Sequence, residues 1–188
     1  MLDIGIFRKI PLINNITRTD GTKSSNKAQI TNISVSENYT TYTESGYKVI
    51  KIGNSEQTLT GKHSYTIKYR YNIGKDPLKN ADELYYNLIG NEWDTTIKKL
   101  SFTIKMPKTF DKTLLGFSSG SKGSTNSSNI SYSVDGNIIN GSINSPLRAG
   151  EGVTIRLTLP EGYFVKAGWK IDIYSIIIIA ISTCFILV

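Results

Sequence analysis

Carboxylates gathered in one short segment are the residues of this chain best suited to acid–base or metal chemistry. The chain has 15 acidic side chains, among them Asp76, Asp82, Glu83, Glu92 and Asp94. Paired carboxylates perform general acid–base catalysis, and carboxylate oxygens bind Ca²⁺. No Asp-x-Asp-x-Asp-Gly calcium loop is present. We therefore interpret these acids as solvated turn residues and keep catalysis by segment 76–94 as the alternative.

The histidine and cysteine content argues against nucleophilic catalysis and thiolate metal sites. His63 is the only histidine, so a serine or cysteine triad would have to use it. The only cysteine, Cys184, lies in an apolar stretch, and no G-x-S-x-G motif occurs. One cysteine forms neither an intrachain disulfide nor a four-thiolate zinc site. We interpret His63 as a turn or strand-edge residue and predict no enzymatic activity, no metal and no cofactor.

Alternation of apolar and polar side chains predicts the elements that must position these residues. It is clearest in segments 65–71, 100–106 and 153–159. A period of two places successive side chains on opposite faces of a strand, one toward a core and one toward water. The dipeptide Asp135-Gly136 between two apolar runs predicts a tight hairpin.

Weaker patterns complete the secondary-structure prediction. Segments 30–35 and 47–52 are predicted strands, and segment 77–88 is predicted to hold a helical turn. The polar segments 17–27 and 118–129 are expected to be loose. Short strands separated by frequent turns are typical of a sandwich. The sequence therefore predicts an all-β fold, an antiparallel β-sandwich-like domain over residues 1–168.

The C-terminal stretch has the composition of a membrane segment. Residues 173–188 contain no charged side chain. A helix needs about 20 apolar residues to cross a bilayer, so residues 171–188 are predicted to be the start of a transmembrane helix. Trp169, Lys170 and Tyr174 stand where interfacial anchors belong. The lipid bilayer is thus a predicted partner through residues 173–188.

The net charge of +7 is unevenly distributed along the chain. Residues 1–75 sum to +6, residues 76–94 to −4 and residues 95–172 to +5. A basic surface suits nucleic acid, anionic lipid or an anionic polymer. No arginine cluster or basic helix is present, and lysines alternate singly with polar residues. Solvated strand faces are therefore expected, and nucleic acid is not a predicted partner.

Segment 82–93 is expected to organise the core rather than to catalyse. Its apolar residues are joined by Tyr85 and Trp93, which are large enough to dominate packing. Gly90 is predicted to occupy a turn that needs positive φ. Arg8, in an apolar setting between Phe7 and Ile10, needs a counter-charge when half-buried.

The acidic side chains Glu83 and Glu92 are the candidate partners for this arginine. The sequence alone leaves the choice between the two open.

Four motifs have a familiar order: GIFRKIP (5–11), GKHSYTIKY (61–69), DELYYNLIGNEW (82–93) and GEGVTIRLTLPEGYF (150–164). Over residues 5–164 the chain resembles the extracytoplasmic domain of the YciQ-like predicted bacterial membrane proteins, domain of unknown function 2207. It departs from that pattern at Tyr86, where Trp is frequent, and at Lys9, where an acidic residue is common.

The resemblance implies a location and a domain type but no mechanism, because the family has no established catalytic residues. It implies residues 1–170 on the extracytoplasmic side of the cell membrane. It also implies a signal peptide and first strands before this sequence and further membrane segments after it, so the chain is expected to lack both ends. The expected role is a binding or structural module of the bacterial cell envelope, with an envelope protein or an anionic wall polymer as partner.

The alternative is an enzyme that acts on envelope glycan or lipid through segment 76–94. The candidate motif residues, structural or binding, are Arg8, His63, Glu83, Tyr85, Asn87, Gly90, Glu92 and Trp93.

Overall fold

Antiparallel strands make up most of the part of the chain that the structure describes. The structure is a computed structural model and describes residues 6–18, 21–53, 61–74, 78–164 and 178–179. In these residues the one helix is a short 3-10 turn, η1 (Lys112–Leu114), with Asp111 at its N-cap. The predicted all-β, antiparallel fold is confirmed.

A three-stranded sheet lies at the centre of the molecule, in the order β10–β13–β8. Its strands are β10 (Leu115–Gly120), β13 (Gly152–Pro160) and β8 (Ala81–Ile89). Leu157 is paired with Leu84 on one side and Leu115 on the other, and all three are buried. The alternation predicted for segment 153–159 is confirmed, because one face of β13 is in the core and the other is more exposed.

A second sheet packs against the first through aromatic rings. Its strands follow the order β11 (Ile130–Asp135), β12 (Ile138–Ile143), β9 (Ser101–Lys105) and the two-residue β14 (Ile178–Ile179). The predicted turn at Asp135-Gly136 joins β11 and β12. Gly136 has a φ of 57°, as the tight hairpin turn requires. The ring centroids of Phe102 in β9 and Phe117 in β10 are 5.2 Å apart. This contact joins the two sheets into one core.

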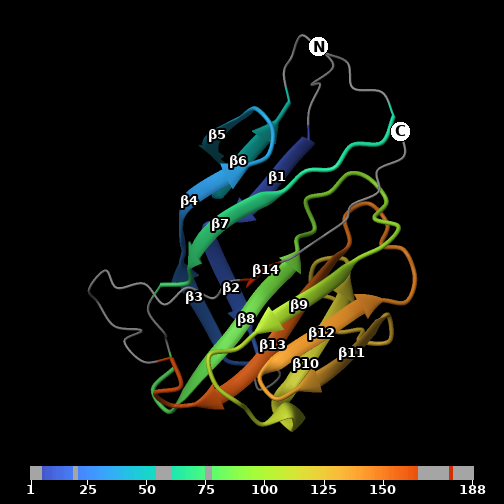
Figure 1. Cartoon of the computed structure of the whole chain (residues 1–188). Coiled ribbons are helices and arrows are strands. Elements are labelled where there is room, and N and C mark those ends of the chain that lie inside the picture. The colour runs from blue at the N-terminus through green and yellow to red at the C-terminus, as the bar shows by residue number, and fades with distance from the viewer. Residues whose placement is uncertain (1–5, 19–20, 54–60, 75–77, 165–177, 180–188) are drawn as a thin grey trace.

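The N-terminal half forms three smaller ladders beside these sheets. They are the sheet β1–β6–β5 and the pairs β2–β3 and β4–β7. The bounds are β1 (Ile6–Pro11), β2 (Ile13–Thr17), β3 (Lys23–Lys27), β4 (Gln29–Val35), β5 (Tyr39–Glu44), β6 (Tyr47–Ile52) and β7 (Ile67–Asn72). Figure 1 shows β1, β5 and β6 at one end of the molecule, with β2 and β3 running toward the central sheet.

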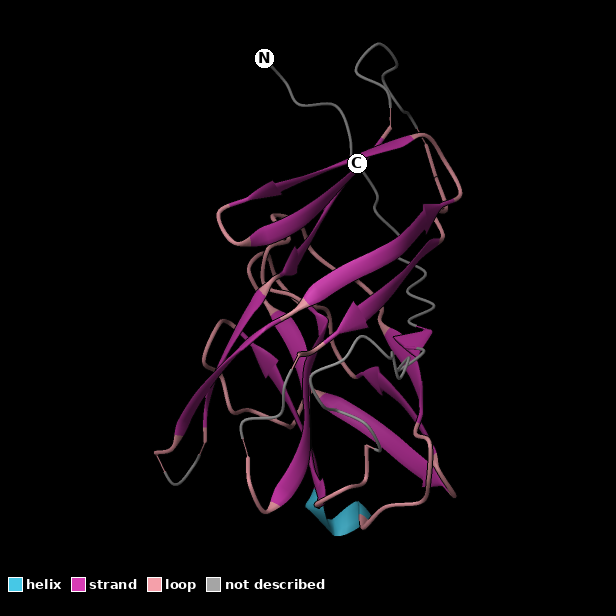
Figure 2. Ribbon diagram, turned by 90° about the vertical axis from the view of Figure 1, so that its left-hand side faces the viewer, coloured by secondary structure: helices cyan, strands magenta, loops and turns pink. Residues whose placement is uncertain are grey.

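One hydrophobic core connects the two halves. Ile10, Ile50 and Ile52 from the N-terminal sheet belong to the same buried cluster as Leu84, Ile104 and Leu157. Figure 2 shows the strands of both halves from the side, with loops at their ends. Burial of apolar surface is the dominant favourable term in folding. The halves are therefore held together mainly by this shared core.

Two local predictions are wrong. Segment 77–88 was expected to hold a helical turn, but Ala81–Ile89 is the strand β8, with Asp82, Leu84, Tyr86 and Leu88 buried in alternation. Segment 17–27 was expected to be loose, yet it contributes β3 and the end of β2 to a hairpin. In both cases pairing with a neighbouring strand outweighs a weak local pattern.

The C-terminal stretch lies almost entirely outside the described residues. Of residues 171–188, the structure describes β14 (Ile178–Ile179), two residues in extended conformation that pair with Ile104 and Thr103 of β9. For these two residues strand takes the place of the predicted helix. In the described part of the chain, no helix is long and apolar enough to cross a membrane.

A glycine in β12 allows an aromatic ring to cover the sheet, which gives a first prediction. Gly141 lies opposite Phe102 in the β12–β9 ladder, and a Cβ at residue 141 would overlap the Phe102 ring. Because that ring is buried, Gly141→Ala is expected to lower the free energy of unfolding by about 1–3 kcal/mol. Urea unfolding of the full chain in detergent measures this change.

Gly116→Ala in β10 is the matched control. A Cβ there would meet its nearest atoms, both of Arg156, at 3.9 Å, which is ordinary contact. Removing a glycine from a strand without a clash should leave the free energy of unfolding unchanged or slightly raised. Equal losses in the two variants would contradict the role of the Phe102 ring.

Candidate functional site

Strand β8 carries the charged and aromatic residues of the candidate site on two opposite faces. Leu84, Tyr86 and Leu88 belong to the buried face, whereas Glu83 and Tyr85 belong to the other. The sequence prediction placed Tyr85 in the packing role. The structure assigns that role to Tyr86, because the strand begins one residue before Asp82 and every second residue enters the core.

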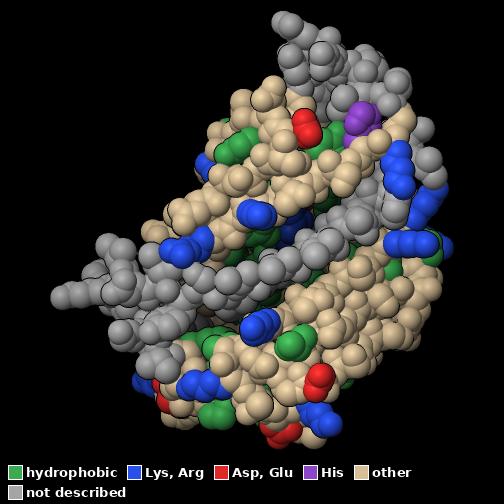
Figure 3. All heavy atoms as spheres, viewed as in Figure 1, with side chains coloured by type: hydrophobic (Ala, Val, Ile, Leu, Met, Phe, Trp, Pro, Cys, Tyr) green, Lys and Arg blue, Asp and Glu red, His purple; other side chains and the backbone are tan. Residues whose placement is uncertain are grey.

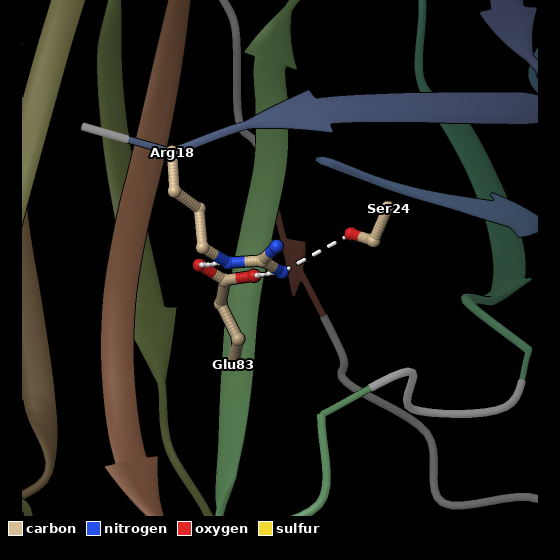
Figure 4. Close-up of polar contacts among 3 residues, drawn as sticks. All are labelled: Arg18, Ser24 and Glu83. Carbon is tan, nitrogen blue, oxygen red and sulfur yellow. Dashed lines mark hydrogen bonds and ion pairs between the residues drawn. The ribbon is translucent and has the colours of Figure 1, made fainter. Parts of the chain in front are cut away.

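Glu83 forms an ion pair with Arg18, just beyond the end of β2 (Figure 4). The guanidinium donates from Nη2 to Oε2 at 2.5 Å and from Nε to Oε1 at 3.3 Å. Nη2 also donates to Ser24 Oγ at 3.1 Å. The side chains of Arg18 and Glu83 are 13% and 7% exposed. A two-point contact of this kind is directional and fixes the hairpin β2–β3 against β8.

The other described acids of segment 76–94 do not share a partner with Glu83. Asp82 is buried, and its Oδ2 accepts the Phe164 N–H at 2.6 Å. The exposed Glu92 accepts the Tyr47 hydroxyl at 2.9 Å. Asp76 lies outside the described residues. Among the residues that are described, no three acidic, histidine or cysteine side chains are placed to share a metal ion.

Arg8 of β1 is surrounded by tyrosines and not by carboxylates. The expectation that Glu83 or Glu92 pairs with it is wrong, because Glu83 binds Arg18 and Glu92 binds Tyr47. Arg8 is only 8% exposed, and the hydroxyls of Tyr69 and Tyr86 lie close enough to its guanidinium to affect its pKa. Burial by itself lowers the pKa of Arg8, but the two phenol oxygens outweigh it, and the net pKa lies above the ordinary value.

The tyrosines around Arg8 form a connected group that we call the tyrosine cluster: Tyr69, Tyr71 and Tyr86. The hydroxyls of Tyr69 and Tyr86 are 2.8 Å apart, and the rings of Tyr71 and Tyr86 meet edge to face at 5.2 Å. The Tyr71 hydroxyl donates to the Pro11 carbonyl at 3.1 Å and accepts from Asn14 Nδ2 at 2.7 Å. The cluster thus ties β1 and β2 to β7 and β8.

Gly90 and Trp93 both follow β8, and Gly90 lies beside Arg8. Gly90 is buried without a positive φ, so the predicted strained turn is wrong. A Cβ at residue 90 would lie 3.9 Å from Arg8 Nη1, which is ordinary van der Waals contact, so Gly90 packs beside the guanidinium. Trp93 is half-buried against the core, and its carbonyl accepts the Gly150 N–H at 2.7 Å.

The remaining candidate residues lie away from Arg8 in the ladder or on the surface. His63 is exposed and stacks on Tyr65, with ring centroids 6.3 Å apart. Asn87 Oδ1 accepts the Thr154 hydroxyl at 2.7 Å across the β8–β13 ladder. Tyr85 lies opposite Arg156 in the same ladder. The structure therefore brings Arg8 and Gly90 together but keeps His63, Tyr85 and Asn87 out of that group.

Sequence reasoning missed Arg18 and the tyrosine cluster. Tyr69 and Tyr71 were assigned correctly to one face of β7, and that shared face was the available signal for a cluster. Nothing in the local sequence marks Arg18, because its partner is 65 residues away. Its position beside a polar turn predicts exposure, whereas the structure buries most of it.

The tyrosine cluster predicts a loss of stability in alkali. Burial raises the pKa of Tyr86 well above 10.0, with a further rise from Tyr69, and burial also raises the pKa of Tyr71. Because folding favours the neutral phenols, their contribution is complete below pH 10 and is lost as pH rises through the folded-state pKa. Urea unfolding at stepped pH should show stability falling from about pH 10 upward.

Tyr86→Phe should flatten this alkaline fall, because it removes the phenol with the largest shift. Tyr132→Phe, at an exposed position of β11, is the control and should keep the wild-type profile. A Tyr86→Phe profile as steep as that of the Tyr132→Phe control would contradict this assignment.

Comparison with known proteins gives one family for this chain. A search of curated proteins and a search of solved structures each returned no match. The family model described as the predicted membrane protein (DUF2207) N-terminal domain matches residues 4–159, which include the tyrosine cluster, Arg8, the Arg18–Glu83 pair and Trp93. The chain therefore belongs to the family of the predicted membrane protein (DUF2207) N-terminal domain.

Proposed function

We propose that this chain is the extracytoplasmic domain of a bacterial envelope protein, anchored through residues 173–188, and that it binds a partner without catalysing a reaction. In this proposal the two central sheets form a β-sandwich that displays its outer faces to an envelope protein or an anionic wall polymer. The main observation in support of a binding role without catalysis is that acidic side chains of segment 76–94 bind other parts of the fold. Of the described acids in segment 76–94, Asp82, Glu83 and Glu92 each accept a hydrogen bond from a residue of another segment.

The carboxylates favour a structural role over acid–base catalysis. A catalytic pair flanks a substrate with two carboxyl groups at a defined separation. Glu83 instead meets a guanidinium with both oxygens, and Asp82 accepts a backbone N–H. A carboxylate held in this way maintains the fold and is not available to transfer a proton to a ligand.

The surface charge favours a polyanionic partner. Figure 3 shows Lys and Arg side chains spread over the visible face, with fewer Asp and Glu side chains among them. Exposed lysines occur on β3, β7, β9 and the loops beside them: Lys23, Lys27, Lys68, Lys98, Lys99, Lys105 and Lys108. Dispersed cations of this kind give weak, salt-dependent attraction to a flexible polyanion.

Location and anchoring are tested by thiol labelling of the full chain in intact bacterial cells. In a Cys184→Ser background, Ser121→Cys introduces an exposed thiol in the turn that follows β10. We expect the protein to stay in membranes after alkaline extraction, and a membrane-impermeant maleimide to label this thiol without cell lysis. Labelling only after lysis, or release from the membrane by alkali, would overturn the proposed location.

Binding and catalysis are separated by incubating the detergent-purified chain with isolated cell walls. Binding predicts co-sedimentation that weakens several-fold as salt is raised and that falls in Lys98→Glu/Lys99→Glu. The enzyme alternative predicts soluble glycan products that disappear in Glu92→Gln, a change at an exposed carboxylate. Product release that depends on Glu92 would replace the binding proposal with the enzymatic one.

A further inference from the structure

Strand β5 is an edge strand without the features that commonly protect such an edge. It pairs with β6 over its whole length in a regular register, and no described strand pairs with its other side. An edge strand offers backbone N–H and C=O groups to any extended chain, and lysine, proline or a bulge on the edge prevents such pairing. Strand β5, with the sequence YTTYTE, contains no lysine, no proline and no bulge.

Other edge strands of the N-terminal half do carry such protection. Strand β1 ends at Pro11, and β3 begins at Lys23 and ends at Lys27. The pairing of β4 with β7 is irregular between Thr31 and Ser34, which disturbs the ladder. Compared with these strands, β5 is open to the addition of another strand.

The side chains of β5 are accessible on both faces of its sheet. Five of its six residues are exposed, and Figure 1 shows the strand at the end of the molecule away from the central sheet. Tyr39 is 37% exposed and Tyr42 is 39% exposed, on opposite faces. The Tyr39 hydroxyl donates to the Ile33 carbonyl at 2.9 Å, which holds this ring in place. Exposed tyrosines of this kind are enriched at protein interfaces.

The sequence of β5 is complementary to itself in an antiparallel pairing. Paired residues must share a face of the sheet, so a twofold axis perpendicular to the sheet places one residue opposite its own copy. With Thr41 on this axis, Thr40 meets Tyr42 of the second copy, and Tyr39 meets Thr43 of the second copy. Each of these pairs joins an aromatic to a β-branched side chain, a combination that stabilises sheets.

Charge does not oppose this pairing. Glu44 is the only charged residue of β5. With Thr41 on the axis, the two copies of Glu44 are six residue positions apart along the ladder, about 20 Å at the rise of a strand. This separation is more than two Debye lengths at physiological salt. An axis at Thr43 or Glu44 would instead bring the two carboxylates close together.

We propose that β5 is a self-association edge, through which two copies of this chain pair antiparallel with Thr41 on the twofold axis. The pairing joins two three-stranded sheets β1–β6–β5 into one continuous sheet. A contact between two strand edges is small, so the dimer is reversible and depends on concentration. The proposal does not rest on the location or on the wall-polymer binding proposed above.

Sedimentation velocity of the full chain in detergent tests the association. The wild-type chain should pass from monomer to dimer as its concentration is raised. Thr41→Lys should raise the dissociation constant about tenfold or more, because it places two ammonium groups directly opposite each other. Thr158→Lys, the same change at an exposed position of the central strand β13, should keep the wild-type value. A wild-type monomer at every concentration, or equal dissociation constants in the two variants, would overturn the proposal.

Cysteine cross-linking tests the register and does not depend on a charged variant. In a Cys184→Ser background, Thr41→Cys should form a disulfide-linked dimer on mild oxidation, because the Cβ atoms of opposite residues are about 4.5–5.5 Å apart. Thr43→Cys should not, because in this register its two copies lie about 14 Å apart along the ladder. Equal yields of linked dimer in the two variants, or none from Thr41→Cys, would refute the pairing.

Discussion

Replacing Glu83 by glutamine is expected to lower the free energy of unfolding by about 3–5 kcal/mol. The change removes one partner of a largely buried ion pair and leaves the Arg18 guanidinium uncompensated beside β8, which is the costly way to break such a pair. The amide cannot supply a second charge-assisted oxygen to Nε and Nη2. Urea unfolding of wild type and variant under identical conditions measures the difference.

Three further variants show whether the loss comes from the pair. Arg18→Met should be similarly destabilising, since it leaves the Glu83 carboxylate without its cation. Arg18→Met combined with Glu83→Leu should recover most of the loss, because well-packed apolar residues replace buried ion pairs at little cost. Glu92→Gln, at an exposed carboxylate of the same segment, should change little. Additive losses in the double variant would mean that the two side chains act independently.

Leu157→Ala is expected to have the other large effect, a loss of about 2–5 kcal/mol. Leu157 is 0% exposed in the middle of β13, between Leu84 and Leu115 on the flanking strands. Removing its branched end leaves a cavity where the three strands of the central sheet meet the rest of the core. The melting temperature and the urea midpoint of the full chain should both fall.

Thr158→Ala is the matched control for this cavity. Thr158 follows Leu157 in β13 but has its side chain on the exposed face. Its replacement should change the free energy of unfolding by no more than about 0.5 kcal/mol. A Leu157→Ala variant as stable as Thr158→Ala would show that the central sheet does not support the core as described.

The parts of the fold that could be predicted are those in which one strand face is apolar along its whole length. Leu157 and Phe102 lie in segments whose alternation is visible without any partner, and both were assigned to buried faces correctly. β8 was missed because Tyr85 and Tyr86 are adjacent and equally large, so aromatic residues stand on both faces. Which of the two tyrosines faces the core is decided by the pairing of β8 with β13.

The polar contacts of the candidate site could not be predicted from short stretches of sequence, for a different reason. Glu83 and Arg18 meet through the placement of the β2–β3 hairpin, which no short window of sequence specifies. The sequence predicted Glu83 or Glu92 as the partner of Arg8, whereas the structure places the hydroxyls of Tyr69 and Tyr86 beside it. Position in a ladder decides which side chains reach a buried group, and such positions depend on pairings between distant segments.

The place of β13 along the chain has a consequence for the order of folding during synthesis. This strand is central in its sheet, yet it is the last long strand among the described residues, and its two partners come earlier in the chain. A chain that emerges N-terminus first must hold β8 and β10 without the strand that lies between them. Unpaired strand edges promote aggregation until they are covered. Closure of the core therefore waits for residues 152–160, and a chaperone that shields β8 and β10 until then would raise the yield of folded protein.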